Sequence, residues 1–160
     1  MKRVIITGPG AAGKSALAVR LGEITSLPVI ELDKLFWRPG LTATPRGQWA
    51  AVQRGLTAQE SWIMDGDLGP YDVPDVRLQA ADTIVFLDFC PARCAWRAVR
   101  RSRECADFWR WLLTYRRRSR LLLLRAIAAH AGDAEIHVLR TPRAVSRFIA
   151  RIAPGTPDLP

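Results

Sequence analysis

The sequence contains few of the residues that build disulfide frameworks or zinc sites, with three cysteines and two histidines among 160 residues. Cys90 and Cys94 stand four residues apart, and no second cysteine or histidine pair at metal-binding spacing accompanies them. Neither a structural zinc site nor a disulfide framework is therefore predicted. Buried or semi-buried free thiols in a reducing cytoplasm are expected instead.

Long apolar runs are also missing. No run approaches the ~20 residues that a membrane-spanning helix needs, and the short "LLLL" at residues 121–124 is flanked by arginines. The N-terminal "MKRVIITG" leads directly into a strand-like run and lacks the pattern of a signal peptide. We therefore expect a cytoplasmic protein with no membrane partner.

Lysine is scarce as well, with three lysines against 21 arginines, and the formal net charge is +9. The imbalance is concentrated between Arg93 and Arg125, where eleven arginines are opposed only by Glu104 and Asp107. A concentrated positive field favours an anionic partner, either nucleotide phosphates or nucleic acid. The alternative is a solvated helix face in a chain of arginine-biased composition.

The chain has a regular alternation of short apolar runs and helical patterns. β-branched and aromatic runs predict strands over 3–7, 27–32, 62–66, 83–89 and 135–139. Helical spacing predicts helices over 15–25, 44–60, 91–103, 106–131 and 142–152. This order predicts an α/β fold, a three-layer α/β/α sandwich around a parallel five-stranded sheet. We expect one domain over residues 1–153 and a disordered tail over residues 154–160.

The segment "GPGAAGKS" at residues 8–15 matches the phosphate-binding pattern G-x-x-x-x-G-K-[ST] between a predicted strand and a predicted helix. The backbone N–H groups of such a loop and the following helix N-terminus form a concave site for phosphate. Lys14 would reach the β- and γ-phosphates of a nucleoside triphosphate, and the Ser15 hydroxyl would ligate Mg²⁺. A chance glycine-rich turn is the alternative, which the flanking strand and helix disfavour. The predicted nucleotide-binding residues are Gly8, Pro9, Gly10, Ala11, Ala12, Gly13, Lys14, Ser15 and Ala16.

Four aspartates stand where predicted strands end, and ligands of a parallel sheet gather at that edge. They are Asp33, Asp65, Asp67 and Asp88. Asp65 or Asp88 would hold Mg²⁺ or its waters, and the strand order decides between them. Asp65 faces the metal if its strand neighbours the strand of the phosphate loop, so we favour Asp65 with Asp88 in support. The alternative for Asp88 is a cap on the helix that Pro91 opens.

Asp33 lies in "ELDKLFW", at the end of the second predicted strand. Its carboxylate would orient an acceptor or take the proton of an attacking hydroxyl group. Phe36 and Trp37 follow it and would form a wall of an acceptor pocket. The alternative for these two aromatic residues is a core cluster under a loop.

Several segments together resemble the bacterial topology-modulation protein family, small P-loop proteins of the adenylate-kinase-like group. The resemblance covers about residues 1–150 and rests on "GPGAAGKS", "LPVIELDKLFWRPG", "WIMDGD", "DVRLQAADTIVFLDF" and "RRRSR". It implies a five-stranded parallel sheet in which the third strand neighbours the phosphate-loop strand, which supports Asp65 as the metal-side carboxylate. It also implies binding of ATP and Mg²⁺.

The resemblance further implies arginines that neutralise the charge of a transferring phosphoryl group. In this sequence they would be Arg97, Arg101 and Arg120, while Arg77 would lie on the acceptor side. The chain departs from the family pattern in two places. The lid is shortened to a stretch near residues 101–109, and Asp67 stands where asparagine is common.

These features predict a kinase that moves the γ-phosphoryl group of ATP to a nucleotide or another small hydroxyl acceptor. The alternative is an ATP-binding regulatory protein with little turnover, possibly associated with DNA, since Trp96, Trp109, Trp111 and Tyr115 are interleaved with the arginines. At helical spacing such aromatic residues belong more often to a core, so nucleic acid is not favoured. A monomer or weak homodimer is expected.

Overall fold

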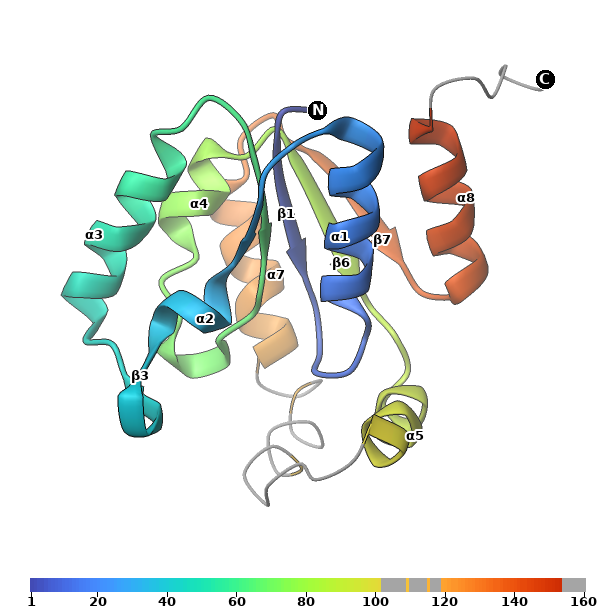
Figure 1. Cartoon of the computed structure of the whole chain (residues 1–160), viewed down its shortest axis with the longest axis horizontal. Coiled ribbons are helices and arrows are strands. Elements are labelled where there is room, and N and C mark those ends of the chain that lie inside the picture. The colour runs from blue at the N-terminus through green and yellow to red at the C-terminus, as the bar shows by residue number, and fades with distance from the viewer. Residues whose placement is uncertain (102–108, 110–114, 116–118, 154–160) are drawn as a thin grey trace.

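A sheet of five parallel strands runs through the molecule, with helices on both of its faces (Figure 1). The computed structural model describes residues 1–101, 109, 115 and 119–153. The strands of this sheet are β1 (Arg3–Thr7), β2 (Val29–Glu31), β5 (Trp62–Asp65), β6 (Thr83–Leu87) and β7 (Glu135–Leu139). The helices are α1 (Lys14–Thr25), α2 (Leu32–Phe36), α3 (Arg46–Thr57), α4 (Asp75–Ala80), α5 (Pro91–Arg101), α7 (Ser119–His130) and α8 (Pro142–Ile152). The predicted three-layer α/β/α fold is confirmed.

The strand order is β2-β5-β1-β6-β7, and each neighbouring pair is parallel. The predicted neighbourhood of β1 and β5 is therefore confirmed, with Ile6 opposite Asp65 in the register. β1, β5 and β6 consist almost entirely of apolar residues because helices cover them on both sides. Their carboxyl ends lie next to one another at one edge of the sheet, at the bottom in Figure 1.

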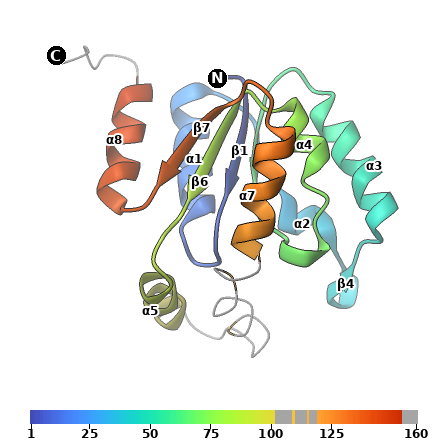
Figure 2. The ribbon, with the colours of Figure 1, turned by 180° about the vertical axis from the view of Figure 1, so that it is seen from behind.

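Alternate side chains of β1 divide the core between the two faces of the sheet. Val4 and Ile6 pack with Leu21 of α1 and Phe148 of α8. Ile5 belongs to the opposite cluster, which α3, α4 and α7 cover (Figure 2). The period-two alternation of a strand thus joins both helical layers to one central strand.

Element boundaries differ from the predicted ones where turns interrupt the pattern. The strand predicted over 27–32 is shorter because α2 begins at Leu32, and the helix predicted over 44–60 begins only after Pro45. A small antiparallel hairpin, β3 (Trp37–Arg38) and β4 (Thr42–Ala43), follows α2 around Gly40, whose φ is +77°. Strands of two residues are too short to leave an alternation in the sequence.

Several sequence predictions concern segments that lie partly or wholly outside the described residues. The shortened lid near 101–109, the helix start at 106 and the tail over 154–160 lie outside the described residues. Cys94 is a buried free thiol, as expected, whereas the free thiol Cys90 is exposed and not buried or semi-buried as predicted. In the described part of the chain, no helix has the length and apolar character needed to cross a membrane.

Candidate active site

The phosphate loop joins the carboxyl end of β1 to the N-terminus of α1, and its path requires glycine at two places. Gly8 has a φ of +141°, and a Cβ atom there would lie 2.6 Å from the Leu87 carbonyl oxygen. Gly13 has a φ of +97°, and a Cβ atom there would lie 3.1 Å from Nη2 of Arg97. Any side chain at Gly8 would push the loop away from β6. The loop geometry therefore fits the predicted phosphate site.

Lys14 begins α1 and folds back over this loop. Its Nζ donates to the carbonyl oxygens of Gly8 at 3.0 Å and Pro9 at 3.1 Å. Desolvation raises the pKa values of Asp33, Asp65 and Asp67, and the positive charge of Lys14 opposes this rise in all three carboxyls. A flexible ammonium group at this point can exchange its carbonyl partners for phosphate oxygens.

The carboxyl group of Asp65 ends β5 and contacts the Ser15 hydroxyl, which lowers its pKa against a larger rise caused by burial. The side chain is 4% exposed, and its Oδ1 atom has no hydrogen-bond partner among the described residues. A buried carboxylate oxygen next to a hydroxyl is the protein part of a Mg²⁺ site, because Mg²⁺ takes one or two such ligands together with phosphates and water. Ser15 and Asp65 therefore fit the predicted metal. Within the described residues, no group of three or more acidic, histidine or cysteine side chains forms a metal cluster.

Asp88, the other candidate for the metal, follows β6 and faces arginines. Arg120 of α7 donates to both of its oxygens at 2.9 Å, and Nε of Arg140 lies 3.6 Å from Oδ2. The Asp88 side chain is 4% exposed, and the hydrogen bond with Arg120 raises the pKa of that guanidinium. Asp88 is therefore engaged by Arg120, whereas Oδ1 of Asp65 has no partner among the described residues, which fits the preference for Asp65 as the metal-side carboxylate.

Two of the predicted arginines lie near the phosphate loop. Arg97 of α5 donates from Nη1 to the Ala12 carbonyl oxygen at 3.3 Å and lies against Gly13. Arg120 is brought to the same edge of the sheet by Asp88, whose neighbour Leu87 contacts Gly8. Arg101 ends α5, and its side chain is outside the described part of the structure. The guanidinium groups of Arg97 and Arg120 thus lie on the phosphate-loop side of this edge of the sheet.

On the other side of the edge, Asp33 and Asp67 lie beyond the ends of β2 and β5. Asp33 is an exposed residue, and partial desolvation of its carboxyl together with the negative charges of Asp65 and Asp67 raises its pKa against the opposing charge of Lys14. Among the described residues, Asp33 has no hydrogen-bond or ion-pair partner, so its oxygens are available to a ligand. This is the arrangement that a general base requires, although its distance to an acceptor depends on the bound complex.

Asp67 is held by uncharged donors. Its Oδ1 accepts from the Gly69 backbone N–H at 2.9 Å, and its Oδ2 accepts from the Tyr115 hydroxyl at 2.9 Å and from Thr7 Oγ1 at 3.5 Å. Burial raises the pKa of Asp67, and burial together with Asp67 raises the pKa of Tyr115 well above its ordinary value. The sequence places Tyr115 among the aromatic residues of the nucleic-acid alternative and predicts no contact with Asp67, because a residue 48 positions away leaves no local pattern.

Arg77 is 1% exposed, and this corrects its predicted place at the acceptor. Its Nη1 donates to Asp72 Oδ1 at 2.8 Å and to Gln53 Oε1 at 3.0 Å, and its Nη2 lies 2.5 Å from Asp72 Oδ2. Asp72 also accepts from Trp49 Nε1 at 3.4 Å. Because a buried guanidinium needs its counter-charge, Arg77 is held in the interior and presents no donor to an acceptor.

The predicted aromatic wall is divided between core and surface. Phe36 is fully buried and packs edge-on against Trp49 at a centroid distance of 5.2 Å, so the core alternative holds for it. Trp37 is 37% exposed and lies 6.0 Å from the ring of Tyr71, which is 53% exposed. The residue that completes the exposed wall is therefore Tyr71, which the adjacent "GPY" turn brings to the surface.

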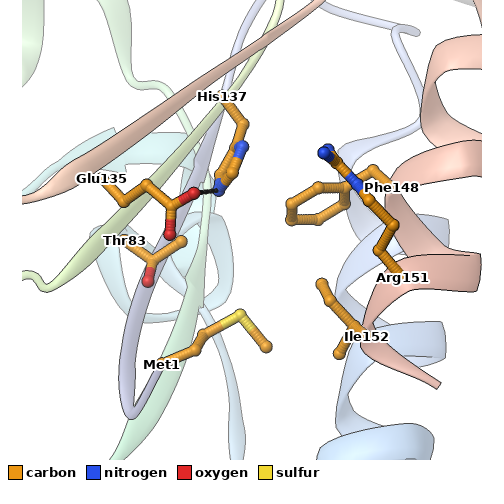
Figure 3. A pocket seen from close by; sticks show the side chains of 7 residues that line it. All are labelled: Met1, Thr83, Glu135, His137, Phe148, Arg151 and Ile152. Carbon is orange, nitrogen blue, oxygen red and sulfur yellow. Dashed lines mark ion pairs between the residues drawn. The ribbon is translucent and has the colours of Figure 1, made fainter. Parts of the chain in front are cut away.

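Two cavities lie at opposite ends of the domain. One of about 310 Å³ adjoins the phosphate loop between α1, α5 and the start of α8, and its lining includes Gly13, Ala16, Phe89, Arg97 and Pro142. The other, of about 330 Å³, lies by the amino ends of β6 and β7, where His137 pairs with Glu135 at 3.1 Å (Figure 3). The first is continuous with the phosphate site and suits the base of a nucleotide, whereas the second is remote from it.

No model of a known protein family matches the chain, and no curated protein matches it. Solved structures share its fold. A gluconokinase from Sinorhizobium meliloti matches with a TM-score of 0.59 and 19% identity over 95% of this chain and 93% of that chain. A shikimate kinase from Acinetobacter baumannii, in complex with shikimate, matches with a TM-score of 0.63 and 16% identity over 95% of this chain and 90% of that chain.

A sugar kinase from Janibacter sp. matches with a TM-score of 0.54 and 19% identity over 96% of this chain and 98% of that chain. At these identities the likeness establishes the fold, which is that of P-loop kinases. The narrower resemblance to the topology-modulation family stays a prediction.

Proposed function

We propose that this protein is an ATP-dependent kinase that phosphorylates a small hydroxyl compound. The observation that carries the proposal is the arrangement at one edge of the sheet. Lys14 of the phosphate loop acts electrostatically on Asp65, which contacts Ser15, and on Asp33, whose carboxylate has no partner among the described residues. Each part alone is common, but together they supply a donor site, a metal site and a base around one charged lysine.

Different residues would bind the phosphates, the metal ion and the base of ATP. The backbone of residues 8–15 would hold the phosphates, with Lys14 moving from its carbonyl partners to the β- and γ-phosphates. Ser15 and Asp65 would hold Mg²⁺, which neutralises phosphate charge when bound. The apolar cavity beside Gly13 and Phe89 would take the nucleotide base.

The transfer itself needs a base and positive charge. Asp33 would accept the proton of the acceptor hydroxyl as that oxygen forms a bond to the γ-phosphorus and the bond to the bridging oxygen of ADP breaks. Arg97, Arg101 and Arg120 would stabilise the charge of the phosphoryl group in transit. The kinase names of the structural neighbours support this reaction class, and one of them is in complex with a small hydroxyl compound, shikimate.

The proposal is tested by Lys14-dependent consumption of ATP. ADP formation is measured with Mg²⁺ and a panel of small hydroxyl compounds, for the wild-type protein, Lys14→Ala and the control Lys2→Ala. Lys2 is an exposed lysine at the opposite end of β1. We expect Lys14→Ala to lose activity by about 10²-fold or more, since a phosphate-binding charge is removed, while Lys2→Ala keeps it. Equal activity in Lys14→Ala and wild type would contradict the proposal.

A second function has one observation in its favour. Trp96 of α5 is 58% exposed, and the Arg100 guanidinium lies 4.6 Å from its ring, a pairing of aromatic and basic groups that suits single-stranded nucleic acid. If the protein binds nucleic acid, its affinity for an oligonucleotide falls steeply with salt and falls again in Trp96→Ala. Absence of binding at low salt removes this second function.

A further inference from the structure

We propose that the phosphoryl acceptor is a hydroxyl compound that carries no negative charge, such as a sugar, a polyol or a nucleoside. This inference rests on the proposed kinase function and adds the chemical class of the acceptor. It comes from the balance of charges on the acceptor side of the sheet edge, around Asp33, Asp67, Trp37 and Tyr71.

The first step concerns the cation that an anionic acceptor would need. Recognition of a carboxylate or phosphate usually takes an arginine with a free planar face of donors. Arg77 is the arginine that the sequence pattern assigns to this side, and both of its terminal nitrogens are bound to Asp72 at 2.8 and 2.5 Å. Its Nε has no hydrogen-bond partner among the described residues, but with 1% of its surface exposed the guanidinium is closed to a ligand.

The other described cations near the aromatic wall are also engaged. Lys34, on α2 beside Asp33, lies 2.6 Å from Glu31 Oε1. Arg38, next to Trp37, donates to the Gln48 side-chain oxygen. Lys14 belongs to the phosphate loop and would be occupied by ATP. Lys34 and Arg38, the described cations nearest in sequence to Asp33 and Trp37, are therefore both engaged with other side chains.

The second step concerns negative charge. Asp72 and Asp88 are each matched by an arginine, whereas the partners of Asp67 among the described residues are the uncharged donors Gly69, Tyr115 and Thr7. Asp33 has no partner among the described residues, and it interacts electrostatically with Asp67. Adding an anion between two unmatched carboxylates costs free energy through repulsion and loss of hydration.

The third step concerns shape. Trp37 and Tyr71 present exposed rings whose centroids are 6.0 Å apart at an interplanar angle of 70°. Such a corner contacts the C–H face of a sugar or the ring of a base, while carboxylates accept from hydroxyl groups. Carboxylates together with aromatic rings suit an uncharged polyhydroxyl ligand.

The test uses matched pairs of acceptors that differ only in charge. One pair is an alditol and its aldonic acid, and the other is a nucleoside and its 5′-monophosphate. Transfer of radiolabelled γ-phosphate is followed with saturating MgATP. We expect kcat/KM for at least one uncharged compound to exceed that of its anionic counterpart by about tenfold or more, the effect of one unscreened charge several ångströms away.

Preference for the anionic member of the pairs would overturn the inference while leaving the kinase function intact. Absence of transfer to any uncharged hydroxyl compound would also overturn it. Failure of the proposed function is recognised separately, because ATP consumption would then not depend on Lys14. An aminated sugar in the same panel distinguishes a neutral acceptor from a cationic one.

A pair of aspartate variants tests the charge argument directly. Asp67→Asn removes one negative charge and keeps an oxygen that can accept from Tyr115. Asp133→Asn is the control, because Asp133 is exposed in the turn between α7 and β7, at the far end of the sheet. We expect Asp67→Asn to lower the ratio of kcat/KM between the uncharged and the anionic acceptor of a pair about tenfold. The same ratio should stay at its wild-type value in Asp133→Asn. Thermal melting of both variants checks folding, and an unaltered preference in folded Asp67→Asn would overturn the inference.

Discussion

The two sides of one sheet edge carry opposite charge, although both are built from aspartates at strand ends. On the donor side, Asp88 is matched by Arg120, and Arg97 lies over the phosphate loop. On the proposed acceptor side, Asp33 and Asp67 have no cationic partner in the described part of the chain, and Arg77 is paired with Asp72 in the interior. Position at a strand end is therefore not enough to assign a role to a carboxylate, since its partners decide what it binds.

The largest effect is expected at Asp33. Asp33→Asn keeps the shape of the side chain and removes the base, so kcat should fall about 10³-fold with little change in ATP binding. Steady-state kinetics and nucleotide titration measure the two quantities, and Asp133→Asn serves as the control. A loss of ATP binding as large as the loss of kcat would indicate that Asp33 contacts ATP and not the acceptor.

The next largest effect is expected from breaking the buried ion pair between Arg77 and Asp72. Arg77→Met leaves the Asp72 charge buried without a partner, which should lower the free energy of unfolding by about 3 kcal/mol or more. Urea unfolding measures this, with the exposed Arg46→Met as the control. If Arg77 instead bound an acceptor directly, the variant would raise KM at nearly unchanged stability.

The same pair predicts a pH dependence of stability. Arg77 lowers the pKa of Asp72 below its ordinary value of 3.8, so this carboxyl binds a proton more readily in the unfolded chain than in the folded one. Its contribution to stability is therefore complete above about pH 4 to 5 and is lost as the pH falls through the lowered folded pKa. Urea unfolding between pH 3 and 7 should show the gap between wild type and Arg77→Met closing toward acid. A constant gap contradicts the assignment.

A smaller effect separates the two candidate metal carboxylates. Asp65→Asn should raise the Mg²⁺ concentration at half-maximal activity about tenfold or more, because it weakens a ligand. Asp88→Asn should lower kcat about tenfold by releasing Arg120, with the Mg²⁺ requirement unchanged. Mg²⁺ titrations of both variants compare the sides directly, and the opposite pattern would make Asp88 the metal ligand.

The smallest effect is expected at Tyr115. Tyr115→Phe removes the hydroxyl that donates to Asp67 and should lower the free energy of unfolding by about 1 kcal/mol. The Asp67 carboxylate keeps its negative charge in this variant, so the preference for uncharged acceptors should persist. Chemical unfolding and the paired-acceptor assay measure the two effects. Loss of the preference for uncharged acceptors would indicate that the Tyr115 hydroxyl itself contacts the acceptor.

Much of the site could be predicted from local sequence because its parts are local. "GPGAAGKS" places Gly8, Lys14 and Ser15 within one strand-to-helix turn, and strand-end position selects Asp33, Asp65, Asp67 and Asp88 as candidates without assigning their roles. The roles of Arg77 and Phe36 could not be predicted in the same way. Their burial depends on Asp72, Gln53 and Trp49, which come from other elements of the fold.

The sequence by itself determined the class of fold, the phosphate loop and which carboxylates stand at strand ends, because backbone geometry and hydrophobic periodicity act over a few residues. Only the tertiary structure decided the partners of those carboxylates. Asp88 meets Arg120 across 32 positions and Asp67 meets Tyr115 across 48. Electrostatic free energy depends on distance in space and on burial, and neither is a property of neighbouring residues in the chain.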